Sequence, residues 1–117
     1  MPPISFGVTS NGYPTVRIAA PFDSFGEFLR AEHSIPRAEH LLETVKRVVS
    51  GQLSEAVVLQ DCGKLTLDRG TGTAKVWIDY LSKGTEVECE MPIVEFSDIA
   101  SAWLHFIEAP RRESIPA

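Results

Sequence analysis

Three glutamates alternate with apolar residues in the stretch TEVECEM, at Glu86, Glu88 and Glu90. Strict alternation predicts a strand with one buried and one exposed face, so the three carboxylates should share the exposed face. Paired carboxylates can hydrolyse glycosides, but that chemistry needs them on opposite sides of a cleft. Same-face residues on one strand lie only ~6.5–7 Å apart and point to water. The stretch therefore predicts a charged surface, which either faces solvent alone or receives a basic partner.

The other residues with catalytic potential form no recognised constellation. His33, His40 and His105 have acidic neighbours but no metal-ligand spacing such as H-x-x-x-H on a helix. The G-x-G of DRGTGT is expected between two strands, where it opens no helix that could hold phosphate. No nucleophile-elbow sequence occurs, and Cys62 and Cys89 form no C-x-x-C pair and are interpreted as free thiols. We therefore predict a protein that is not an enzyme, with no catalytic residue, metal site or cofactor.

The acidity of the chain is concentrated in one segment. Between Asp79 and Asp98 there are six acids and a single base, Lys83, whereas the acids and bases elsewhere balance, so this segment accounts for the whole net charge of −5. A nucleic-acid-binding protein would instead show a basic stripe. No apolar run approaches the ~18 residues of a membrane span, and the first ten residues lack a signal-peptide pattern. We expect a cytoplasmic protein without nucleic-acid or membrane partners.

Hydrophobic periodicity predicts a hairpin and three helical stretches around these residues. Strands are expected at 4–8 and 15–19, joined through an Asn-Gly turn. A helical period follows over 24–51. Pro36 divides this stretch into two short helices or kinks a single one, and Ser24 and Glu27 have the spacing of a capping box.

The last helix is expected over 94–109, with Trp103 and Phe106 buried where it meets the sheet.

Four strand-like runs separated by turn residues occupy the centre of the chain, at 55–60, 64–68, 74–80 and 86–91. The order of hairpin, helix, meander and helix predicts an α+β fold. Its sheet should be mostly antiparallel, built from the hairpin and a four-strand meander, with helices packed on one face. The length predicts a single domain over 1–109, followed by a flexible C-terminal tail at 110–117.

The uncovered face of that sheet is where the glutamates are expected. If Gly84 forms a bulge, Val87 and Cys89 join the apolar residues of the preceding strand inside. Trp77 and Asp79 then lie outside, beside the carboxylates. Tryptophan is favoured at binding hot spots because its ring supplies contact area and its N–H a hydrogen bond. Two alternatives stay open: the tail or a loop covers Trp77, or the register is the other one. The predicted partner-binding residues are Trp77, Asp79, Glu86, Glu88 and Glu90.

Three parts of the chain, FGEFLRAEH…AEHLLETVKRVVSG, the meander and VEFSDIASAWLHFIEA, together resemble the YacL-like group of small bacterial proteins. The same α+β outline occurs among immunity proteins of contact-dependent growth inhibition systems (CdiI). This resemblance implies a cytoplasmic protein that forms a heterodimer with the toxin domain of a large exported adhesin and blocks it. Many such toxins are nucleases with basic clefts, which a row of carboxylates could occupy as a phosphate mimic.

The sequence thus predicts an immunity protein that neutralises a cognate toxin domain through an acidic surface. The alternative is a YacL-like housekeeping protein of unknown role that self-associates through its open sheet, and a third is a small hydrolase.

Overall fold

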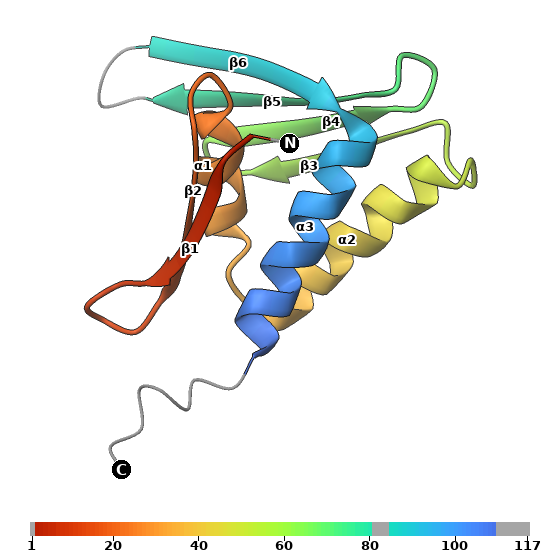
Figure 1. Ribbon diagram of the computed structural model, residues 1–117. Coiled ribbons are helices and arrows are strands. Elements are labelled where there is room, and N and C mark those ends of the chain that lie inside the picture. The colour runs from red at the N-terminus through yellow and green to blue at the C-terminus, as the bar shows by residue number, and fades with distance from the viewer. Residues whose placement is uncertain (1, 81–84, 110–117) are drawn as a thin grey trace.

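The computed structural model describes residues 2–80 and 85–109. Within them the chain forms three helices and two antiparallel sheets, one of two strands and one of four, which confirms the predicted α+β fold. The helices lie on one side of the four-stranded sheet, and the hairpin runs beside them (Figure 1). The predicted tail at 110–117 and Gly84 lie outside the described residues.

The N-terminal hairpin is a sheet of its own rather than part of the larger one. Its strands are β1 (Ile4–Val8) and β2 (Pro14–Ile18), so β2 begins one residue earlier than predicted. Helix α1 (Asp23–Ala31) packs closely on β2. A Cβ atom at Gly26 would lie 3.3 Å from the carbonyl oxygen of Val16, and Arg30 Nη1 donates a hydrogen bond to that oxygen at 2.6 Å. These contacts fix the hairpin against α1.

The predicted helical stretch forms two separate helices, which was one of the two predicted alternatives. Helix α2 (Ile35–Val49) begins at Ser34, whose hydroxyl accepts a hydrogen bond from the Arg37 backbone N–H at 3.3 Å. Pro36 lies in its first turn, and Gly51 follows its end with a φ of +88°, a left-handed conformation that favours glycine.

The capping box predicted for α1 is wrong. The residue before α1 is Phe22, which makes no side-chain cap, and Ser24 lies buried inside the helix. Its hydroxyl hydrogen-bonds to the thiol of Cys89 on the sheet instead, so a tertiary contact replaces the local one.

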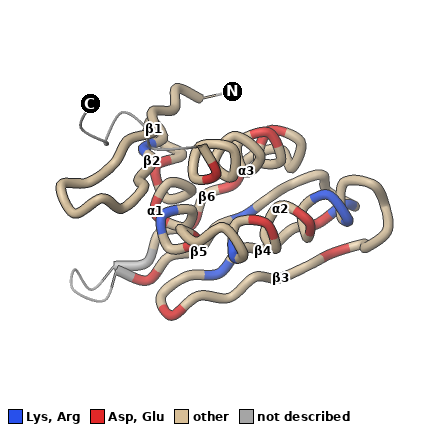
Figure 2. The backbone as a smooth tube through the Cα atoms, turned by 90° about the horizontal axis from the view of Figure 1, so that it is seen from below, with Lys and Arg blue, Asp and Glu red and all other residues tan. Residues whose placement is uncertain are grey.

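The four remaining strands form a meander in chain order: β3 (Glu55–Gln60), β4 (Gly63–Asp68), β5 (Thr73–Tyr80) and β6 (Thr85–Pro92). Strand β3 therefore forms one border of the sheet (Figure 2) and β6 the other. Alternate side chains on the middle strands, such as Leu65, Leu67 and Val76, are buried under the helices. The opposite set points to the face that no described helix covers.

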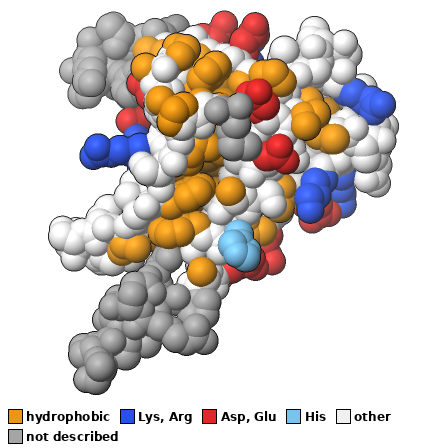
Figure 3. Space-filling model, in the orientation of Figure 1, with side chains coloured by type: hydrophobic (Ala, Val, Ile, Leu, Met, Phe, Trp, Pro, Cys, Tyr) orange, Lys and Arg blue, Asp and Glu red, His pale blue; other side chains and the backbone are white. Residues whose placement is uncertain are grey.

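Helix α3 (Ile93–Glu108) packs mainly on α2 and, through its aromatic residues, on the hairpin. Trp103 is fully buried, its ring lies 6.2 Å from that of Phe6, and its Nε1–H donates to the Glu32 carbonyl at 2.9 Å. Burial of Trp103 was predicted, but its aromatic partners come from β1 and α3 itself. Phe106 is only half-buried, because it lies against the hairpin, 5.2 Å from the Phe6 ring, at the margin of the core. Hydrophobic side chains gather on the surface between the hairpin and α3 (Figure 3).

Candidate functional site

The pairing of β5 with β6 brings the predicted partner-binding residues together. Trp77 lies directly opposite Glu88, and Asp79 lies opposite Glu86. Residues directly opposite in an antiparallel pair share a face, with Cβ atoms ~4.5–5.5 Å apart. The register is therefore the one that leaves Trp77 on the outer face beside the glutamates, and the alternative register is excluded.

Burial of the individual side chains follows this arrangement. Glu88 and Glu90 are 57% and 58% exposed, whereas Trp77 and Asp79 are half-buried. Trp77 has Lys64 of β4 on one side and Glu88 of β6 on the other, so its ring lies among charged side chains. Only the backbone position of Glu86 is described.

One residue of the predicted inner face is incompletely covered. Val87 was expected inside with Cys89, yet it remains 38% exposed. It lies opposite Ile78 near the start of β6, at the border of the sheet, where the helices cover little of the strand.

The Lys75 side chain lies between the carboxylates of two glutamates. Its Nζ atom lies 3.9 Å from a carboxylate oxygen of Glu88 and 4.0 Å from one of Glu90. One cation therefore stands between two exposed carboxylates, which keeps a local excess of negative charge at the β6 border. Exposed ion pairs of this length contribute little to folding, at most ~1 kcal/mol. The arrangement leaves both carboxylates accessible to another cation.

A shallow hollow of about 440 Å³ lies on this open face between Trp77 and the loop that joins β4 to β5. Two lysines and three carboxylates surround it, together with threonine hydroxyls. Six of its residues are not among the predicted partner-binding residues: Lys64, Thr66, Asp68, Thr71, Thr73 and Lys75. The alternation in KLTLD could have predicted three of them, since it puts Lys64, Thr66 and Asp68 on the face opposite two leucines.

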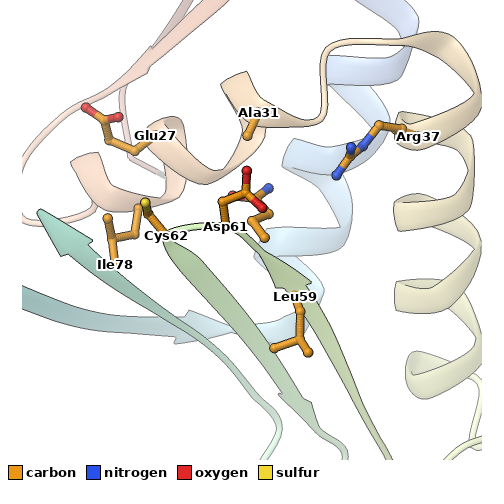
Figure 4. A pocket seen from close by; sticks show the side chains of 8 residues that line it. Glu27, Ala31, Arg37, Leu59, Asp61, Cys62 and Ile78 are labelled. Carbon is orange, nitrogen blue, oxygen red and sulfur yellow. The ribbon is translucent and has the colours of Figure 1, made fainter. Parts of the chain in front are cut away.

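A second hollow, of about 580 Å³, lies at the other end of the meander, where α1 faces the turn after β3 (Figure 4). It contains the exposed thiol of Cys62, and Arg37 points into it from α2. Glu27 at its rim is paired with Arg30 at 2.7 Å, and Arg37 with Glu32 at 2.7 Å. No histidine is among the residues that line it, so the thiol lacks the thiol–imidazole pairing of cysteine hydrolases.

The three histidines lie apart, His33 after α1, His40 on α2 and His105 on α3, and all are exposed. In the described part of the chain, no group of three or more His, Cys, Asp or Glu residues is arranged to hold a metal ion. None of the helices within residues 2–80 and 85–109 combines the length and apolarity needed to cross a bilayer.

Comparison with known protein families, with curated proteins and with solved structures yields no match to this chain.

Proposed function

We propose that this protein is a stoichiometric inhibitor of the immunity class, which captures a basic toxin domain on the open face of its four-stranded sheet. The observation that carries the proposal is the pairing of Trp77 with Glu88. It puts a half-buried indole beside two carboxylates that are more than half exposed, on a face that no described helix covers. This combination of an aromatic anchor and a charged rim is typical of binding surfaces.

The charge distribution assigns different tasks to the parts of this surface. Glu88 and Glu90 lie at the sheet border and would attract a cationic cleft over a distance, which raises the association rate. Trp77 lies nearer the centre and would slow dissociation once it is covered. Lys75, which now bridges the two glutamates, would be displaced or would bind an acidic group of the partner. Inhibition of this kind needs no catalytic group, and we place the complex in the cytoplasm.

The direct test is capture of the protein encoded by the preceding gene. If that gene encodes a large exported adhesin, its purified C-terminal domain should form an equimolar complex with this chain and lose its toxicity. A C-terminal domain that neither binds nor is neutralised would refute the proposal.

Within such a complex, Trp77→Ala should accelerate dissociation, at a loss of about 2 kcal/mol or more in binding free energy. The matched control is Tyr13→Ala, which removes an exposed aromatic ring from the hairpin turn, away from the sheet face. Surface-based binding kinetics would measure both variants. Equal dissociation rates for the two would mean that the partner does not cover Trp77.

A further inference from the structure

The two borders of the four-stranded sheet differ in their protection against pairing with another strand. Border strand β6 has the exposed glutamates 88 and 90 and ends at Pro92, and charges and proline are the usual means of blocking an edge. Border strand β3 has no charged residue and no proline between Ala56 and Gln60. Its only charged residue is Glu55 at the start, and Asp61 follows its end, so the tube in Figure 2 is tan between two red ends.

The unprotected border also exposes apolar side chains. On the open face of the sheet, Val57 is 54% exposed and Leu59 is 70% exposed. The Leu59 side chain points from β3 away from the helices (Figure 4). In the described chain, β4 is the only strand that pairs with β3, so the backbone groups on its outer side have no strand partner there. Exposed apolar side chains beside open backbone groups form a template for another strand.

There is room for that strand on the helix side as well. A groove of about 560 Å³ separates β3 from the start of α2 and is lined by Val57, Val58, Pro36, His40 and Thr44, among others. Arg37, which also lines the groove, is paired with the buried carboxylate of Glu32 at 2.7 Å. The groove leaves space between α2 and β3, and an added strand could place its inward side chains there.

We propose that β3 pairs antiparallel with β3 of a second copy of this chain, around a two-fold axis at Val58. In this register Val57 of each copy lies opposite Leu59 of the other, so four exposed apolar side chains meet on the open face. Ala56 lies opposite Gln60 on the helix side. The two meanders become one continuous sheet, and this contact leaves Trp77 and the β6 glutamates uncovered, at the far side of each meander. The pairing is independent of the proposed toxin binding.

A second copy suits this border better than a charged peptide does. The central residues of β3 are neutral and apolar, so they complement themselves in an antiparallel pair, and a two-fold contact closes without further growth. The register brings Glu55 of one copy near Asp61 of the other at each end, which opposes pairing. A single strand pair buries less than the ~1,200 Å² of a stable interface. We therefore expect a weak dimer that dissociates on dilution and strengthens with added salt.

Sedimentation equilibrium of the full chain from micromolar to millimolar concentration tests the proposal. The average mass should rise from that of the 12.9 kDa monomer toward twice that value. Leu59→Glu should remain monomeric throughout, because its carboxylate would meet Val57 of the second copy, while Lys64 on the adjacent strand supports it within the monomer. Val94→Glu on α3 is the control, since Val94 is 60% exposed and the charge change is identical. This control should dimerise as the wild type does.

Cross-linking tests the register. In a Cys62→Ser background, Val58→Cys should form a disulfide-linked dimer on oxidation, because the two-fold axis puts these residues opposite each other within bridging distance. Val57→Cys should not, because its opposite residue is Leu59. The proposal is overturned if the wild type stays monomeric at millimolar concentration, if Leu59→Glu still dimerises, or if Val58→Cys dimers do not cross-link.

Discussion

The two tryptophans of this chain show how burial separates a structural residue from a candidate binding residue. Trp103 has no exposed surface, contacts two phenylalanine rings, and its N–H donates to the Glu32 carbonyl. Trp77 is half-buried on an open sheet face between a lysine and a glutamate. The same side chain therefore stabilises the fold in one position, and in the other it lies where the proposed partner would contact it.

Replacement of each tryptophan by alanine should separate these roles. Trp103→Ala leaves a large cavity and an unpaired carbonyl in the core, and we expect a loss of ~3–5 kcal/mol in unfolding free energy. Trp77→Ala should lose clearly less, because solvent already reaches its ring. Urea denaturation of both variants measures the difference. Equal losses would show that Trp77 belongs to the core, which would remove it from the proposed binding surface.

The two thiols should differ in reactivity. Burial raises the pKa of the Cys89 thiol above its ordinary value, although hydrogen bonds from Ser24 and the start of α1 partly oppose this effect. The reactive species is the thiolate, so Cys89 should be poorly alkylated near neutral pH. Cys62 is exposed and should react first. Mass spectrometry after brief treatment with iodoacetamide should find one modified cysteine, at position 62. Faster modification of Cys89 would mean that the contact between α1 and β6 opens readily.

At the scale of single elements, the start of α2 depends on a local cap. The Ser34 hydroxyl accepts the Arg37 N–H, so Ser34→Ala should destabilise the protein by ~0.5–2 kcal/mol. Ser101→Ala, at an exposed position within α3, is the control and should change stability little. Thermal denaturation of both variants provides the comparison. A midpoint for Ser34→Ala that matches the control would mean that Pro36 and the packing of α2 suffice to start the helix.

Most elements of this fold could be predicted because their signals are local. Alternating residues in the meander, the Asn-Gly turn of the hairpin and the helical period before Gly51 each specify an element within a few residues of sequence. The cap of α1 could not be predicted in this way. Ser24 has the right spacing from Glu27, but its hydroxyl bonds to Cys89, which is distant in sequence. The position of the hairpin beside α1 and α3 likewise depends on tertiary packing.

The candidate site was predictable in part for the same reason. Alternation places Trp77 and the glutamates on the outer face once the register of two adjacent strands is known. The contribution of β4 was missed, because Lys64 reaches Trp77 only through the pairing of a third strand. Alternation also places Lys75 beside the glutamates and predicts that it neutralises one of them at most, whereas its Nζ lies near both Glu88 and Glu90, which depends on the conformation of a long side chain across two strands. Neither feature has a signature within one segment of sequence.

At the scale of the whole molecule, salt should act in opposite directions on the two proposed interactions. Capture of a basic domain by the β6 carboxylates should weaken as salt rises, because screening acts beyond ~10 Å at 0.1 M. Self-association through β3 should strengthen, because it joins two copies of net charge −5 through a neutral strand. Sedimentation and binding kinetics over one salt series measure both. The same direction of change for both would show that charge acts alike at the two surfaces, and would contradict the proposed difference between the charged β6 border and the neutral β3 border.

The central claim is that the open face beside Trp77 captures a cationic toxin domain. Its most direct test is the association rate of the cognate toxin domain with the double variant Glu88→Lys and Glu90→Lys. The control is Glu39→Lys with Glu108→Lys, which makes the same charge change at two exposed helix positions, and thermal denaturation checks that both variants fold. We predict at least a tenfold slower association for the first variant at low salt, and a near-wild-type rate for the control. If the folded first variant associates as fast as the control, the toxin docks elsewhere and the glutamates serve only to protect the border of the sheet.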